Sequence, residues 1–315
     1  MKKILFVLSI ALPGLLTQLR AISADPDATI CSSASIIFCS EFEEGTLSGW
    51  DAVNGATTPA IVADTGPFAR AGNNVLRLYV APTLSGANAN VIKTFTGAQK
   101  VYARWYQKWE TGYDFSALNH GSGLNAGYRW DYGRSGDRPD GTDWFSSWLE
   151  PNATGDTSDF GRLYFYTYYR GMYMDCANPV GSCWGDHLPC MIGPNYCTKA
   201  PVRVPPPWPP VTQTNRWYCL EVMLDGGTPT PTQTGANGAQ DFWIDGVEYG
   251  PWTSLWHRTT ATAMNVNLLA LNTFYHTAHA GVGVRYDNVV VSTSRIGCVS
   301  PSSAPTSPKN LRIVP

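Results

Sequence analysis

Three stretches of the 315-residue sequence carry side chains that can move protons or bind an acidic substrate. Residues 102–123 contain Arg104 and His120, residues 163–170 contain Tyr166, and residues 272–281 contain His276. An imidazole can remove a proton near neutral pH, a phenol can return one to a leaving oxygen, and a guanidinium can offset a carboxylate. Eliminative cleavage of a uronic-acid polymer requires these three abilities together.

The predicted catalytic set is therefore Arg104 as the group that neutralises the carboxylate, His120 or His276 as the base, and Tyr166 as the acid. His120 lies in the glycine-rich run NHGSGLNAG, whose permissive backbone lets a side chain reach a ligand. This interpretation requires Arg104, Tyr106, His120 and Tyr166 to converge in one open cleft. The predicted substrate-binding residues are aromatic and polar neighbours of this set: Tyr106, Lys108, Asn119, Trp130, Tyr164, Tyr168, Asn272 and Tyr275.

Three other functions compete with the lyase prediction. Exposed tryptophans and tyrosines also stack on sugar rings, so a carbohydrate-binding or adhesion protein without catalysis is the main alternative. A glycoside hydrolase would need two carboxylates across the scissile bond, and no E-x-D-x-E run is present. A metal-dependent enzyme could use His276 and His279 with His120 or His187, although two loop histidines are a weak metal signal.

The elements that must position these residues are predicted to be strands. Runs rich in β-branched and aromatic residues recur between Gly, Asn, Asp, Pro and Thr clusters, and helical periodicity is almost absent. In residues 101–109, Arg104, Tyr106 and Lys108 share one face, and in residues 163–170 the three alternating tyrosines share another. We therefore expect an all-β protein with two packed antiparallel sheets, a jelly-roll-like sandwich. Residues 130–160 and 175–215 are interpreted as long loops.

The ends of the chain and its composition indicate an exported protein. Residues 1–24 combine two lysines, a short apolar run and small residues, which predicts a signal peptide. Residues 25–298 are predicted to form the sandwich, and residues 299–315 a Ser/Pro-rich tail. The balance of 22 basic and 24 acidic residues argues against nucleic acid as a partner. We expect a secreted or periplasmic monomer that binds polysaccharide without inserting into a membrane and uses no organic cofactor.

Eight cysteines fit an oxidising compartment. Cys176, Cys183, Cys190 and Cys197 are evenly spaced in the second long loop, where disulfides are favoured over zinc because zinc pairs usually stand closer together. The spacing does not fix the connectivity. A bond between an N-terminal cysteine and Cys298 is one hypothesis, since terminal strands of sandwiches often lie side by side.

Several segments resemble the concanavalin-like jelly rolls of carbohydrate-binding modules, laminarinase-like hydrolases and polysaccharide lyases, including heparinase-, alginate- and glucuronan-lyase-like enzymes. The segments are FEEGTLSGW and AGNNVLRLYV near the start, VRYDNVVVSTSRIG at the end, and RWYCLEVMLDGG with GAQDFWIDGVEYGPW between them. The resemblance covers most of residues 36–298. It implies a structural calcium ion that joins the two ends of the domain, with Glu41 or Glu43 and Asp287 as ligands.

Overall fold

The computed structural model describes residues 30–55, 59–68, 73–82, 86–116, 119–127, 137–153, 160–172, 184–189, 209–276 and 281–299. Within these ranges the chain forms two antiparallel sheets, and its one helical element is the short turn η1 (Ile30–Ser32). The predicted all-β sandwich is thus confirmed. Within the same ranges, no helix is long and apolar enough to span a membrane.

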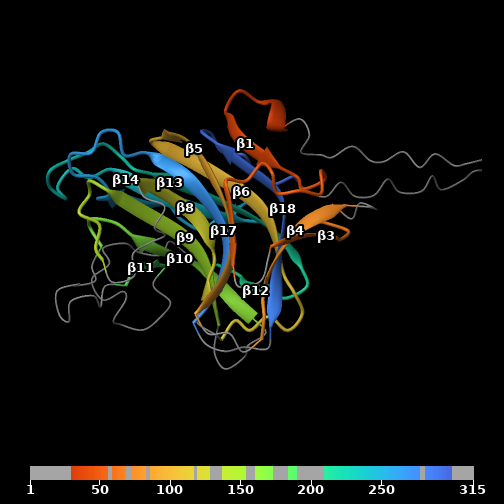
Figure 1. Ribbon diagram of the computed structural model, residues 1–315. Helices are drawn as coiled ribbons and strands as arrows, with labels where there is room; N and C mark the ends of the chain where they lie inside the picture. Colours follow the sequence, from red (N-terminus) through yellow and green to blue (C-terminus); the bar gives the residue numbers. More distant parts are fainter. Residues whose placement is uncertain are drawn as a thin grey trace, which may run out of the picture.

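The first sheet contains the two ends of the described chain (Figure 1). Its order is β15 (Val247–Glu248), β14 (Gly238–Ile244), β13 (Trp217–Asp225), β6 (Lys100–Trp109), β18 (Val282–Ser292), β4 (Asn74–Val80) and β3 (Ala60–Ala63). In addition, β1 (Ile36–Ser40) pairs with β18, and β16 (Trp252–Leu255) pairs with β14. The pairing of β1 with β18 places the terminal strands side by side, as the sequence indicated.

The second sheet contains the histidine- and tyrosine-bearing strands. Its order is β11 (Asp186–Leu188), β10 (Phe160–Tyr168), β9 (Trp144–Ala153), β8 (Ser122–Gly127), β17 (Val266–Tyr275), β5 (Ala87–Ala98) and β2 (Ala52–Gly55). Two short strands complete it: β12 (Val211–Gln213) pairs with β10, and β7 (Asn119–His120) pairs with β17. The two loops predicted from sequence therefore contain strands, since β9 lies within residues 130–160 and β11 and β12 lie within residues 175–215.

Aromatic side chains join the two sheets. Phe165 of β10 contacts Phe242 of β14 and Trp252 of β16, with ring centroids 5.2 and 5.7 Å apart. Trp105 of β6 is fully buried in the same core. Because side chains alternate along a strand, the neighbours of these residues must point to the outer faces. Tyr164 and Tyr166 therefore lie on the outer face of the second sheet, and Arg104 lies on the outer face of the first.

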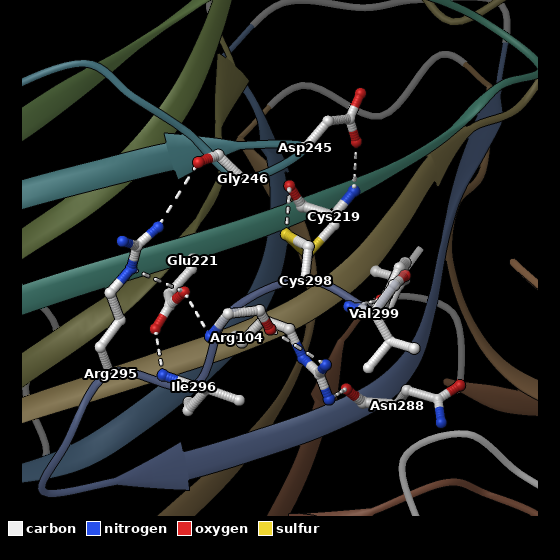
Figure 2. Close-up of a disulfide and its surroundings, with 12 residues drawn as sticks. Arg104, Cys219, Glu221, Asp245, Gly246, Asn288, Arg295, Ile296, Cys298 and Val299 are labelled. Atoms are coloured by element: carbon white, nitrogen blue, oxygen red, sulfur yellow. Dashed lines mark hydrogen bonds and ion pairs between the residues drawn. A yellow bond between two sulfur atoms is a disulfide. The ribbon is translucent and has the colours of Figure 1, made fainter. Parts of the chain in front are cut away.

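The end of the described chain packs onto the outer face of the first sheet (Figure 2). The carboxylate of Glu221 accepts hydrogen bonds from the backbone N–H groups of Ile296 and Gly297, at 2.7 and 3.0 Å. Arg104 lies beneath this segment, is fully buried, and donates to the carbonyl oxygens of Asn288 and Gly297. These contacts offset part of the cost of burying two charged groups.

Two disulfides lie within the described residues, Cys31–Cys39 and Cys219–Cys298. The hypothesis of a bond between an N-terminal cysteine and Cys298 is wrong, because Cys298 follows β18 across the outer face of the first sheet and meets β13 instead. Cys31 pairs with its near neighbour in β1. The four evenly spaced cysteines, Cys176, Cys183, Cys190 and Cys197, lie outside the described residues.

Candidate functional site

His120 is the centre of a polar and aromatic group on the outer face of the second sheet. It ends the two-residue strand β7, where it pairs with Phe274 of β17. Its ring Nδ1 lies 2.6 Å from Oε1 of Glu150 in β9. The other carboxylate oxygen of Glu150 accepts a hydrogen bond from the Tyr164 hydroxyl at 3.3 Å. Glu150 thus fixes the orientation of the imidazole and leaves its Nε2 on the opposite side of the ring.

The charges of His120 and Glu150 depend on each other. Burial by itself lowers the pKa of His120, but the charge and hydrogen bond of Glu150 outweigh this effect, so the pKa of His120 is raised. Burial raises the pKa of Glu150, and the charge of His120 together with the hydrogen bonds from His120 and Tyr164 only partly offsets this effect. The His120 side chain is 24% exposed and that of Glu150 is 1% exposed. The pair therefore presents a basic imidazole to the surface above a buried carboxylate.

Tyrosines of β10 surround this imidazole. The ring of Tyr166 stacks on that of His120 with centroids 5.1 Å apart. The hydroxyl groups of Tyr166 and Tyr168 are 2.8 Å apart. Burial and the neighbouring Tyr168 raise the pKa of Tyr166, so its hydroxyl keeps its proton at neutral pH. The prediction that Tyr164, Tyr166 and Tyr168 share one face is confirmed.

Two further histidines complete the group, which we call the His120 cluster: His120, Glu150, Tyr164, Tyr166, Tyr168, His187 and His276. Nε2 of His276 lies 2.8 Å from Nε2 of His120. Burial and the charge of His120 lower the pKa of His276. The same two effects lower the pKa of His187, which lies in β11 beside Tyr164 and Tyr166, to about 3. His120 is therefore the histidine of this cluster that most readily accepts a proton.

The structure separates Arg104, Tyr106 and Lys108 from the His120 cluster. All three lie on β6 of the first sheet, on the face that points away from the core and hence away from the second sheet. The Tyr106 hydroxyl bonds to the backbone of Val299, and Lys108 forms a 2.7 Å ion pair with Asp64. The expectation that Arg104 and Tyr106 share a cleft with His120 and Tyr166 is wrong, because the two pairs occupy opposite surfaces of the sandwich.

Asn119 and Tyr275 also differ from their predicted positions. They are opposite partners in the β7–β17 pairing, they are almost completely buried, and Tyr275 contacts the core residue Tyr113. The Asn119 amide donates to the Asp114 carbonyl at 2.9 Å, which anchors the loop that precedes β7. Both side chains point to the core because they alternate with His120 and Phe274. Trp130 lies outside the described residues.

Asn272 supports the backbone that carries His120. Its side-chain amide donates to the carbonyl oxygens of His120 and Gly121, at 3.3 and 3.2 Å. The structure thus brings together five of the predicted residues around His120: Tyr164, Tyr166, Tyr168, Asn272 and His276.

Sequence reasoning missed Glu150 as a member of this group and considered His187 only as a ligand of the alternative metal site. Glu150 lies in a segment that we interpreted as a loop because of its many polar residues. The aromatic residues Trp144, Phe145 and Trp148 just before Glu150 were nevertheless a strand signal. His187 lies on the three-residue strand β11, which is too short to show a period.

The residues predicted to bind calcium lie on the first sheet, where β18 carries Asp287 and the segment after β1 carries Glu41 and Glu43. Asp287 is fully buried and accepts hydrogen bonds from the Asn73 side chain at 3.0 Å and the Asn288 backbone at 2.8 Å. Glu43 accepts a bond from the Asn74 backbone at 3.3 Å, and Glu41 follows β1. Within the described ranges no three His, Cys, Asp or Glu residues gather as metal ligands. A calcium ion here would therefore need amide and backbone oxygens as well.

Comparison with known proteins shows the fold. No protein-family model matches the sequence, and no curated protein matches it. Among solved structures, alginate lyase vAL-1 from Chlorella virus is 11% identical, with a TM-score of 0.55. The alignment covers 82% of this chain and 100% of the lyase chain.

Two further alginate lyases are comparably similar. A variant of alginate lyase Aly36B in complex with alginate trisaccharide is 14% identical, with a TM-score of 0.54. The alignment covers 82% of this chain and 94% of the Aly36B chain. The PL-14 alginate lyase from Aplysia kurodai is 12% identical, with a TM-score of 0.52. Here the alignment covers 83% of this chain and 100% of the lyase chain. The protein has the two-sheet jelly-roll fold of these lyases, and the predicted fold is confirmed.

The contact between Glu150 and His120 predicts a change in the titration of the imidazole. In Glu150→Gln the pKa of His120 should fall, because the charge that raises it is gone and the burial that lowers it remains. NMR titration of the imidazole signals measures this shift directly. Asp245→Asn, which removes one charge from an exposed turn, should leave the titration unchanged. An unaltered pKa of His120 in Glu150→Gln would contradict the described contact.

Proposed function

We propose that this protein is an eliminative lyase that cleaves a uronic-acid polysaccharide at the His120 cluster. The observation that carries the proposal is the 2.6 Å contact between Nδ1 of His120 and Glu150, which leaves Nε2, on the side of the ring next to His276, as the atom that can accept a proton. A carboxylate that fixes the tautomer and orientation of an imidazole is a common way to make a histidine an effective base. The alginate lyases that share the fold support the same reaction class.

Two residues of the cluster carry the proton transfers of the reaction. Nε2 of His120 takes the proton from the carbon next to the uronate carboxylate. The electrons of that C–H bond form a double bond as the neighbouring C–O bond breaks. Tyr166 gives its hydroxyl proton to the leaving oxygen, and its raised pKa keeps that proton available. His276, whose Nε2 faces that of His120, moves aside or contacts the substrate when a sugar binds.

The same geometry disfavours a glycoside hydrolase. Hydrolysis of a glycosidic bond uses two carboxyl groups that face each other across the sugar. Within the described part of the chain, Glu150 is the carboxylate of the His120 cluster, and His120 and Tyr164 engage its two oxygens. A base and a phenol side by side support elimination instead.

We further propose that the protein is exported and binds a structural calcium ion. Disulfides are typical of oxidising compartments, and two lie in the described residues. Asp287 and Asn73 support the calcium site, because the carboxylate is fully buried and Oδ1 of Asn73 is buried without a hydrogen-bond partner. Oxygen atoms of this kind are calcium ligands, and Glu41 and Glu43 lie on the adjoining segment.

Loss of the base or the acid should greatly slow turnover without unfolding the protein. We expect His120→Ala and Tyr166→Phe each to reduce the rate by roughly 10²–10⁴-fold, because each removes one proton-transfer group. The ultraviolet absorbance of the unsaturated product measures the rate on alginate and glucuronan. Tyr79→Phe, on the first sheet, is the matched control and should keep full activity.

The pH dependence adds a second constraint on the same assay. Activity should rise as the pH passes upward through the raised pKa of His120, because only the neutral imidazole accepts a proton. Full activity in both substituted proteins would reject the assignment of base and acid. Retained sugar binding without any turnover by the unsubstituted protein would favour a carbohydrate-binding role.

Calcium should stabilise the protein against heat. A ligand present at 100 times its Kd adds about 2.7 kcal/mol to the free energy of unfolding. Removing bound calcium with a chelator should therefore lower Tm by several degrees, and added calcium should restore it. Asp287→Asn should weaken this response. If Tm is the same with chelator and with calcium, the calcium proposal fails.

A further inference from the structure

Three asparagines form a row across the outer face of the second sheet. Asn54 of β2 lies opposite Asn90 of β5, and Asn90 lies opposite Asn272 of β17. Directly opposite residues of an antiparallel pair share one face, with Cβ atoms roughly 4.5–5.5 Å apart. Asn272 in turn donates to the carbonyl oxygens of His120 and Gly121. The row therefore runs up to the backbone that carries the proposed base.

The orientation of the middle amide is fixed by its neighbour. The NH₂ group of Asn54 donates to Oδ1 of Asn90 at 3.1 Å, so the oxygen of Asn90 faces β2. The NH₂ group of Asn90 must then point the other way, and among the described residues it has no hydrogen-bond acceptor. The side chain is only 2% exposed. The nitrogen itself is not one of the fully enclosed side-chain atoms without a partner. A ligand or an ordered water can therefore reach this donor.

The other candidate for carboxylate binding, Arg104, lies on the first sheet, where carbonyl oxygens of Asn288 and Gly297 accept from its guanidinium. The His120 cluster still needs a donor for the substrate carboxylate, since an uncompensated carboxylate opposes removal of the adjacent proton. A carboxamide N–H of the middle residue of the row, Asn90, can meet this need.

We propose that the NH₂ group of Asn90 binds the carboxylate of the uronate unit from which His120 removes a proton, and that this contact selects uronates over neutral sugars. The inference rests on the proposed lyase function, because it assigns a substrate contact in that site. Asn54 acts as a positioning residue that keeps the donor side of Asn90 toward the sugar. Asn272 holds the backbone of β7 and so sets the distance between this contact and the base.

Binding without turnover tests this inference separately from catalysis. In a Tyr166→Phe background, calorimetry measures the binding of an alginate trisaccharide and of the same sugar after its carboxyl groups are reduced to alcohols. Asn90→Asp places a negative charge against the uronate and should weaken its binding at least tenfold, while the reduced sugar should bind as before. Asn215→Asp adds the same charge in an exposed turn and should change neither affinity.

Asn54→Ala keeps the experiment decisive if Asn90→Asp lowers the melting temperature. It leaves Asn90 intact but frees its amide to turn, so uronate affinity should fall by less than in Asn90→Asp. Unchanged uronate affinity in both variants would overturn the role of Asn90 and leave the lyase proposal standing. Failure of the Tyr166→Phe protein to bind any uronate oligosaccharide would overturn both. Weaker uronate binding together with an inactive unsubstituted protein would support the carboxylate contact and reject the lyase reaction.

Discussion

A carboxylate that is buried on the outer face of a sheet organises the site of this protein. Glu150 accepts from His120 on one oxygen and from Tyr164 on the other, so one side chain joins β7, β9 and β10. Burying a charge in this way is unfavourable unless hydrogen bonds or an opposite charge compensate it. The compensation here comes from the groups that the proposed chemistry uses. Structure and reactivity consequently depend on the same contact.

The alternation of side chains along the strands sets a second constraint. Once Phe165 and Trp105 enter the core, Tyr166 and Arg104 must point outward, and they do so from different sheets. The outer face of the first sheet is occupied by the end of the described chain, which Cys298 and the backbone bonds to Glu221 hold in place. The outer face of the second sheet keeps an exposed histidine. The proposed site therefore lies on the outer face of the second sheet, which the end of the described chain does not cover.

Periodicity in the sequence predicted the fold class and the side-chain alternation of β6 and β10. The pairing of the terminal strands was expected from sandwich folds in general. Periodicity did not predict which sheet each strand joins, because strand pairing depends on contacts between distant residues. Arg104 and Tyr166 therefore looked like neighbours although the core separates them. Glu150 was missed because residues 130–160, which include its strand, contain many polar residues and were interpreted as a loop. Asn90 was missed because its significance comes from a hydrogen bond with Asn54, 36 residues away.

The central claim is that a uronate binds on the outer face of the second sheet with its acidic carbon–hydrogen bond toward His120. A crystal structure of the Tyr166→Phe protein with a bound uronate oligosaccharide tests this claim most directly. The account predicts a sugar ring beside His120, with the carbon next to the carboxylate facing Nε2. A sugar bound on the outer face of the first sheet, or an imidazole turned away from Glu150 in the complex, would contradict it.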